Sequence, residues 1–470
     1  MLLNHLRLFW QKFFRIFCHV LPLSNHAFCH FFMNQDNNQS NFLGRAKHTL
    51  RALRSRNYRL FFFGQGVSLT GTWMQRIAVS WLVYRLTDSP FLLGLTGFAG
   101  QIPTFLFAPI AGVIADRYDR KTIVIISQIL SLFQALALAI LVLAHLIQVW
   151  MVIALSVVLG IINSFEMTSR QSLVVDMLEK REDLGNAIAL NSSIFNGSRL
   201  IGPTVAGILI AAVGEGICFL LNALSFIAVI IALFAMRIPP RVITYKNPSM
   251  LRGLKEGFSY AFGFPPIRSI LSMLSLTNLT GMQYVVLMPI FARDILHGGP
   301  NTLGYLMGAT GVGALCGAIF LASRKTVLGL GRWIGVAAGI LGIGLILFST
   351  SKLFILSALL LLPIGFGMMV HMASSNTVLQ TIVDDDKRGR LMSIYAMSIM
   401  GMSPLGSLIA GSAASKIGAP TTLIIAGAVC LLASIIFYKS LPALRKLVRP
   451  IYRQKGIIKE VANGLQSTSQ

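Results

Sequence analysis

The stretch 112–121 reads GVIADRYDRK, and five of its ten residues are charged: Asp116, Arg117, Asp119, Arg120 and Lys121. Charged residues make up only 12% of the whole chain, and long apolar runs lie on both sides of this stretch. A short, highly charged segment between apolar runs is typical of a turn between membrane-spanning helices, because the charged side chains stay in water. This turn therefore predicts a membrane protein.

The composition supports the same interpretation. The 470 residues are 55% hydrophobic, and the mean hydropathy is +0.72, whereas a soluble domain has about 25% charged residues. A helix needs roughly 20 apolar residues to cross the bilayer core. Backbone groups in lipid must pair within their own segment, so long apolar runs must be helices. We expect an all-α membrane protein that crosses the bilayer many times.

The net charge of +24 does not indicate nucleic-acid binding. Lysine and arginine residues lie between the apolar runs and at the two ends of the chain, not on one face of a soluble domain. This distribution is typical of cytoplasmic membrane loops. The five cysteines have no metal-ligand spacing and require no disulfide.

Twelve apolar runs are long enough to span the membrane. Their predicted limits are 60–85, 91–115, 122–144, 149–169, 188–213, 216–236, 268–293, 301–323, 330–350, 353–378, 389–414 and 420–440. The turns after the even-numbered spans and the two tails hold most of the basic residues. The positive-inside rule therefore places both termini in the cytoplasm, and we expect the inner membrane of a bacterium.

An internal repeat divides the chain into two halves. Three glycines at 197, 202 and 207 recur 204 residues later at 401, 406 and 411, and Leu93-Gly94 recurs 210 residues later as Leu303-Gly304. Two six-span halves in the same order are typical of transporters whose substrate site lies between the halves. The expected parts are an N-terminal extension, a first half, a linker, a second half and a tail, at 1–57, 58–237, 238–267, 268–440 and 441–470.

Residues 1–32 allow two interpretations. Basic and polar side chains recur every four residues among aromatic ones, which would suit an amphipathic helix in the membrane interface. The interpretation we favour is an upstream extension, with Met33 as the working start.

The charged turn resembles the loop motif between the second and third helices of the major facilitator superfamily, Gly-x-x-x-Asp-Arg-x-Gly-Arg-Lys, with Asp119 where that pattern has glycine. The segments at 71–90 and 181–207 resemble a narrower bacterial branch that contains enterobactin-type siderophore exporters and many predicted drug exporters. The resemblance covers about residues 55–440. It implies the major facilitator fold, with twelve transmembrane helices in two pseudo-symmetric six-helix halves.

The resemblance also implies a role for the turn as a gating latch. In this superfamily the loop aspartate, here Asp116, contacts the start of the eleventh helix when the cytoplasmic side is closed. That start carries Arg388, and a helix N-terminus adds a partial positive charge. Arg117, Arg120 and Lys121 could pair with acids on neighbouring helices, or they could serve only to fix the topology.

Glu166 and His371 are the candidates for proton coupling. Glu166 is the one acid well inside an apolar run, and a carboxylate there is costly unless it is paired or protonated. Arg170 lies one helical turn further on, so a permanent structural pair is an equal alternative. A shift of 205 residues carries Glu166 onto His371, whose side chain changes charge near neutral pH, although a lone helical histidine is more often a packing residue.

Arg76 and Arg199 are predicted near mid-membrane, where an arginine usually faces a polar cavity. Arg199 belongs to the pattern of the narrower branch, and a structural role is the favoured interpretation for it, so Arg76 is the better candidate for a contact with substrate. Two deep cations against one deep acid favour an anionic cargo such as a catecholate or carboxylate siderophore. Gly202-Pro203 resembles an antiporter motif, and Gly197 and Gly207 extend it along one helix. The same glycines could serve only helix packing.

We therefore expect a proton-coupled exporter of a small organic anion, working as a monomer in membrane lipid by alternating access. The chain has no nucleotide-binding motif, metal-ligand cluster or nucleophilic triad, so neither an enzyme nor a cofactor is expected. A multidrug or macrolide efflux pump is the first alternative. An uptake carrier and a non-transporting membrane sensor are less favoured.

Overall fold

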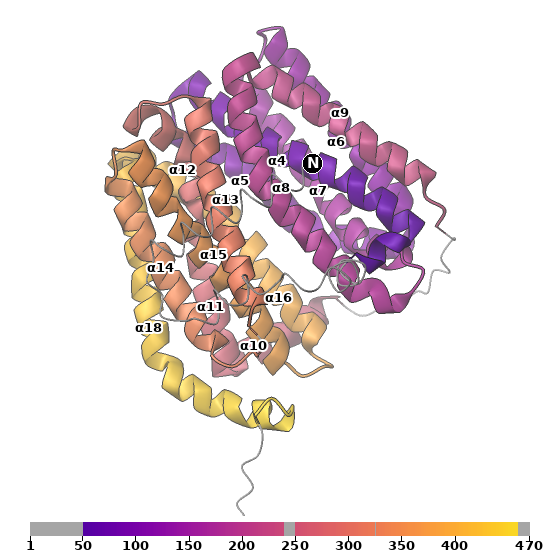
Figure 1. Cartoon of the computed structure of the whole chain (residues 1–470), viewed down its shortest axis with the longest axis vertical. Helices are drawn as coiled ribbons and strands as arrows, with labels where there is room; N and C mark the ends of the chain where they lie inside the picture. The colour runs from indigo at the N-terminus through magenta and orange to yellow at the C-terminus, as the bar shows by residue number, and fades with distance from the viewer. Residues whose placement is uncertain (1–49, 239–249, 325, 459–470) are drawn as a thin grey trace, which may run out of the picture.

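The computed structural model describes residues 50–238, 250–324 and 326–458 and is all-helical over them (Figure 1). The expectations for residues 1–32 fall outside these residues. The first half consists of η1 (Arg51–Arg54), α4 (Arg56–Thr87), α5 (Pro90–Arg117), α6 (Arg120–Leu143), α7 (Val149–Asp176), η2 (Arg181–Asp183), α8 (Leu184–Val213) and α9 (Glu215–Ala235).

The described part of the linker contains one short helix, α10 (Met250–Gly263). The second half then consists of α11 (Pro265–Leu279), η3 (Gly281–Gln283), α12 (Tyr284–Ile290), the π-helical η4 (Phe291–Ile295), α13 (Pro300–Ala322), α14 (Leu330–Thr350), α15 (Phe354–Ile382), α16 (Arg388–Met400), α17 (Met402–Ile417) and α18 (Ala419–Gln454). The two halves form two bundles that lie side by side (Figure 1).

In the described part of the chain, eleven helical segments are long and apolar enough to cross a membrane. The expected first span, α4, is long enough at 32 residues but is not among the eleven. Its interior carries Gln65, Gln75 and Arg76, which lower its hydropathy. Gln75 nevertheless packs inside the first half, where it binds Gln134 and Asn222 through its side-chain amide. Gln75 thus faces other helices of the first half.

Two predicted spans are broken helices. The seventh consists of α11, η3, α12 and η4, and the eleventh consists of α16 and α17. The break between α16 and α17 falls at Gly401, three residues before Pro404, whose ring lacks an N–H and clashes with the carbonyl one turn earlier. The last predicted span ended at 440, but α18 continues to Gln454.

We call the end of the bundle that carries the basic turns the basic end. Contacts between neighbouring turns define it. Arg51 pairs with Asp183 at 3.1 Å, and Lys121 donates to the carbonyl oxygen of Met236 at 2.8 Å. In the second half, Lys455 donates to the carbonyl oxygen of Val383 at 2.9 Å. The other end, at the junctions of α4 with α5 and of α12 with α13, is called the opposite end.

The two halves meet at two equivalent helix crossings, which the repeat relates to each other. A Cβ added to Gly207 of α8 would lie 2.7 Å from Gly304 Cα on α13, and one added to Gly411 of α17 would lie 2.7 Å from Gly94 Cα on α5. Both positions therefore require glycine, because any side chain would meet backbone. Gly94 and Gly304 are the pair related by the 210-residue shift, so the structure is pseudo-symmetric at these crossings.

Candidate functional site

Two arginines and a tryptophan form a cluster in the interior of the bundle. Trp73 and Arg76 lie one turn apart on α4, and Arg199 comes from the neighbouring α8. The guanidinium carbon of Arg76 is 4.8 Å from the centre of the Trp73 ring, and that of Arg199 is 5.8 Å from it. Phe195, one turn before Arg199, packs edge-on against Trp73 at 5.7 Å. The expected pair of deep cations is therefore brought together on one aromatic face.

The cluster lies deep between the halves. Arg76 is eleven residues before the end of α4 at Thr87, which is about 16 Å at 1.5 Å per residue. Its side chain is exposed, whereas that of Arg199 is half-buried. Arg199 donates across the interface to the sulfur of Met368 on α15 at 2.9 Å. An exposed arginine at this depth, beside a contact between the halves, indicates a space between them that water can enter.

No carboxylate neutralises either arginine among the described residues. A thioether sulfur is only a weak acceptor, so the contact with Met368 leaves most of the Arg199 donors free. Guanidinium groups bind carboxylates and other planar anions through paired donors, and an aromatic face binds a flat ring. The cluster can therefore bind an aromatic or carboxylate anion.

Glu166 lies outside this cluster, toward the basic end of α7. Arg170 Nε donates to Glu166 Oε1 at 2.7 Å, and Gln128 Nε2 donates to the same oxygen at 3.4 Å. The side chains of Glu166 and Arg170 are only 13% and 18% exposed. The predicted pair is thus present inside the first half, and a partly buried carboxylate with one cation can serve either of the two roles considered above.

His371 is fully buried in α15. Its Nδ1 lies 3.0 Å from the carbonyl oxygen of Ile334, which can only accept, so Nδ1 carries a proton. Its Nε2 lies 3.0 Å from the Thr277 hydroxyl. Both ring nitrogens of His371 therefore have hydrogen-bond partners while the ring is neutral. This arrangement favours a packing role for His371, whereas the surroundings of Glu166 leave both of its roles open.

The charged turn between α5 and α6 is held mainly within the first half. Asp119 is the N-cap of α6, and its Oδ2 accepts hydrogen bonds from the backbone N–H and the hydroxyl of Thr122 at 2.8 and 2.7 Å. Such a cap stabilises a helix start by about 1 kcal/mol, which accounts for aspartate where the superfamily motif has glycine. Arg120 lies 3.5 Å from Asp176. Arg117 is exposed.

Asp116 and Arg388, the two ends of the predicted latch, do not pair in this structure. Asp116 is 81% exposed, and its ion-pair partner is Arg120 at 3.7 Å. Arg388 pairs with Asp385 at 3.6 Å, beside the Lys387–Asp384 pair at 3.1 Å. Hydrogen bonding from Lys387 lowers the pKa of Asp384. At the basic end, each of these charged side chains therefore forms its ion pair with a residue of the same half.

At the opposite end, charged side chains join the halves. Arg293 on η4 forms an ion pair with Asp88, which follows α4. The hydroxyl of Tyr84 on α4 donates to the carboxylate of Asp294. The guanidinium carbon of Arg293 also lies 5.6 Å from the centre of the Tyr84 ring. Two pairs therefore cross the interface within one helical turn of each other.

Sequence reasoning missed these four residues. None of them was among the predicted site residues. A signal was available, because Asp88 and Asp294 end the matching spans of the two halves and each lies close to an arginine, Arg85 or Arg293.

The predicted packing residues of α8 are Gly197, Gly202, Pro203 and Gly207, and the structure packs only some of them closely. A Cβ on Gly202 would lie 2.6 Å from Trp73 Cβ, so this glycine allows α4 to approach and positions the aromatic ring of the cluster. The carbonyl oxygen of Pro203 lies against Gly304, beside the Gly207 crossing. A Cβ on Gly197 would meet nothing within 4 Å. Gly202, Pro203 and Gly207 therefore serve close packing, and Gly197 does not.

Residues 47–450 match the transmembrane secretion effector family. The chain is also similar to the staphyloferrin A transporter of Staphylococcus aureus, with 26% identity over 81% of this chain and 95% of that protein. It is 25% identical to the multidrug efflux pump Tap of Mycolicibacterium fortuitum, over 83% and 96% of the two chains. It is 23% identical to macrolide efflux protein A of Streptococcus pyogenes, over 81% and 96%.

Solved structures show the same fold. A peptide transporter of the POT family superposes with a TM-score of 0.67 over 84% of this chain and 96% of its own, at 12% identity. A bacterial homologue of the iron transporter ferroportin, in an inward-facing state, superposes with a TM-score of 0.62 over 82% and 98%, at 17% identity. The expected major facilitator fold is confirmed.

Proposed function

We propose that this chain, which belongs to the transmembrane secretion effector family of the major facilitator superfamily, is a proton-coupled exporter of a small organic anion in a bacterial inner membrane. The chain is a multi-pass transporter and not an enzyme. The observation that carries the finer proposal is the Trp73–Arg76–Arg199 cluster, in which two cations lie over one aromatic ring and pair with no carboxylate of the described residues. A carboxylate or catecholate siderophore has the charge and the flat groups that this cluster would bind.

The conformation of the two halves supports entry of cargo to the Trp73 cluster from the basic end. The halves are joined by charged pairs at the opposite end, whereas Asp116 and Arg388 each pair within their own half. With the basic end in the cytoplasm, by the positive-inside rule, cargo would enter the cluster from the cytoplasm. The latch between Asp116 and the start of α16 would form when the basic end closes, and the transporter would then open outward.

Glu166 is the better candidate for the proton. Its carboxylate is held by a single cation and lies partly exposed, so it can lose that cation and take up a proton when the halves move. His371 has no exposed atom and no charged partner.

A Glu166→Gln variant tests this role. It should keep the binding of cargo and lose at least tenfold of the transport that a pH gradient drives in proteoliposomes, because the amide cannot carry a proton. A Glu179→Gln variant, which removes an acid from the turn after α7, is the matched control. Full gradient-driven transport in Glu166→Gln would remove Glu166 from the coupling step and leave the ion pair with Arg170 as its role.

Multidrug or macrolide efflux is the second candidate function. Two of the similar proteins are a multidrug efflux pump and a macrolide efflux protein. The cluster adds Phe195 and Met368 to its aromatic ring, and thioether and aromatic groups adapt to many apolar ligands. Two cations disfavour cationic drugs but not neutral macrolides.

The experiment that separates the two compares a deletion strain with its parent under iron limitation. Small molecules are profiled in cells and medium. Siderophore export predicts that one anionic compound accumulates in the cells and disappears from the medium, and that wild-type protein restores its export whereas Arg76→Gln does not. An unchanged profile together with new macrolide sensitivity would instead establish the second function.

A further inference from the structure

A cavity lies at the basic end of the second half. Its lining residues all come from the second half, whereas the Trp73 cluster lies on α4 and α8 of the first. The cavity has a volume of about 360 Å³ and lies between the start of α11, the turn before α14 and the last part of α18. The long α18 leaves the bundle after its membrane span and curves beneath the second half (Figure 1). The cavity is therefore at the level where a membrane helix enters the cytoplasmic interface.

The wall of this cavity is apolar. Ile270 of α11 and Phe437, Leu441 and Leu444 of α18 are buried against one another in one hydrophobic cluster. Val448 and Tyr452, one and two turns further along α18, continue the same face. A tyrosine at the end of an apolar surface is typical of the membrane–water interface, where the ring lies in lipid and the hydroxyl in water.

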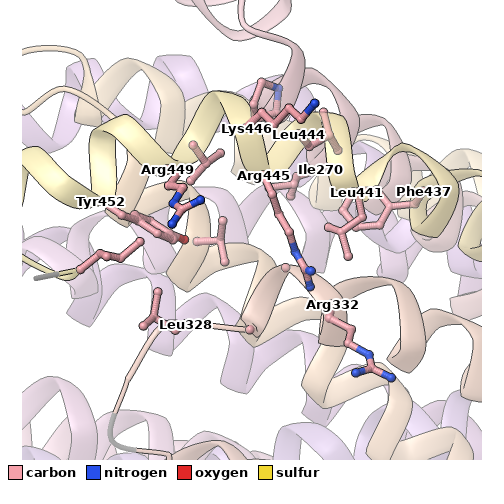
Figure 2. Close-up of a pocket in the computed structure, with 16 residues that line it drawn as sticks. Ile270, Leu328, Arg332, Phe437, Leu441, Leu444, Arg445, Lys446, Arg449 and Tyr452 are labelled. Carbon is pink, nitrogen blue, oxygen red and sulfur yellow. The ribbon is translucent and has the colours of Figure 1, made fainter. Parts of the chain in front are cut away.

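The rim of the cavity is cationic. Arg332 at the start of α14 and Arg445, Lys446 and Arg449 on α18 all line it, and no acid does. Figure 2 shows Arg445 and Arg449 extending from α18 into the space toward α14 and Leu328, whereas the amine of Lys446 points away from them. None of the four has an ion pair among the described residues, and all four are exposed.

Three acids at this end of the second half are engaged elsewhere. Asp384 pairs with Lys387, Asp385 with Arg388, and Glu256 with Arg390. The rest of the chain offers no anionic segment, because residues 1–49 contain only Asp36 and residues 459–470 only Glu460 as acids. Among the described residues, no acidic side chain pairs with the cations of the rim.

We propose that this cavity binds an anionic phospholipid of the adjacent leaflet. The phosphate would lie between Arg332, Arg445 and Arg449, and an acyl chain would cover the wall of Ile270, Phe437 and Leu441. Basic pockets between membrane helices on the cytoplasmic side bind such headgroups. The combination of an apolar wall and a cationic rim at the interface selects a molecule that has both an anionic head and a chain, and not a free phosphate ion, which would use the rim alone.

The site has a structural consequence for α18. Pro442 and Pro450 lie inside the continuous helix, and because proline has no N–H to donate, the helix is weakened on either side of the arginines. A lipid held between α14 and α18 would fasten this segment to the second half. The proposed site is separate from the Trp73 cluster, so its test does not depend on which cargo the transporter carries.

The test uses the full-length protein in detergent and native mass spectrometry. Delipidated protein is incubated with phosphatidylglycerol, with phosphatidylcholine or with inorganic phosphate. We expect a retained phosphatidylglycerol adduct, little phosphatidylcholine and no effect of millimolar phosphate on the adduct. The Arg445→Gln/Arg449→Gln variant should retain phosphatidylglycerol roughly 25-fold less strongly, at about fivefold for each cation removed.

A matched control removes two cations from the same helix outside the cavity. Lys439 and Arg453 are exposed on α18 and do not line it, so Lys439→Gln/Arg453→Gln has the same net charge as the test variant. Equal lipid loss in the two variants would show non-specific surface attraction and overturn the proposal. Displacement of the lipid by phosphate alone would assign the rim to a soluble anion and overturn it also.

A second measurement covers the case in which the arginine variant does not fold. A photoactivatable phosphatidylglycerol is crosslinked to the wild-type protein, and the labelled peptides are identified. Labels in the segments 266–270 and 437–452 support the site. Labels spread over the lipid-facing surface without enrichment there contradict it.

Discussion

The two ends of this transporter use charge in different ways. At the opposite end, Arg293 and Asp294 of the second half bind Asp88 and Tyr84 of the first. At the basic end, Asp116 pairs with Arg120 and Arg388 with Asp385, each inside its own half. Contacts inside a half can persist while the halves move as rigid bodies, whereas contacts between the halves must break. The comparison identifies the opposite end as the closed gate of this conformation.

The glycine crossings lie beside that closed gate, and a substitution there should have the largest effect on transport. In Gly207→Ala the new methyl group would lie 2.7 Å from the backbone of α13, and overpacking of this kind costs about 1–3 kcal/mol. We expect at least a tenfold loss of transport in membrane vesicles at equal protein level. Gly197→Ala on the same helix, where a Cβ meets nothing, is the control and should stay within twofold of wild type. Equal losses in both variants would show that helix propensity, not the crossing, is responsible.

The charged pairs between the halves should have the next largest effect. Asp294→Asn weakens the partly buried contact with Tyr84, and a hydrogen bond to a charged group contributes about 1.5–3 kcal/mol. Asp88→Asn removes the partner of Arg293, a more exposed pair worth about 0–1 kcal/mol. We expect both variants to populate the conformation open at the opposite end, Asp294→Asn more so.

Distances between spin labels on α5 and α13 at the opposite end report this shift. Glu215→Gln is the control, because Glu215 pairs with Arg85 inside the first half at 2.8 Å. A shift in the control as large as that in Asp294→Asn would mean that the contacts between halves do not hold the gate.

Asp116→Asn should have the smallest effect on the conformation described here. Asp116 is 81% exposed, and its pair with Arg120 at 3.7 Å is worth less than about 1 kcal/mol. We expect unchanged thermal stability and an unchanged distance at the opposite end, but slower transport, because the proposed latch forms only when the basic end closes. Asp119→Asn, which can still cap α6, is the control. A lowered melting temperature in Asp116→Asn would indicate a structural role for Asp116 instead.

The sequence predicts the parts of this fold that depend on local pattern. Apolar runs predict eleven of the spans, and the repeated glycines predict two matching halves. They do not identify which helices cross, although only glycine allows the backbones to approach so closely at the two crossings. Arg76 and Arg199 could be predicted as a pair, since deep arginines need a polar space. The contact of both guanidinium groups with the Trp73 ring could not be predicted, because it depends on how α4 and α8 are rotated against each other.

Other features depend on tertiary contacts that no local pattern reports. In the sequence, residues 441–454 have the composition of a polar tail. In the structure, Leu441 and Leu444 are buried against α11 and α14, and the helix continues to Gln454. The pairs of Arg293 and Asp294 join elements more than 200 residues apart. Spacing along one helix predicts Glu166 and Arg170, whereas contacts between the halves require the packed structure.

Crosslinking at the basic end tests the central claim most directly. Cysteines replace Gly112 on α5 and Gly389 on α16, two positions where an added Cβ meets nothing within 4 Å, in a background that lacks the five native cysteines. The account predicts that the pair reacts with a short crosslinker only during turnover, that the linked protein transports nothing, and that cleavage of a reducible linker restores transport. Full transport by the linked protein would contradict the claim that the two halves move apart at this end.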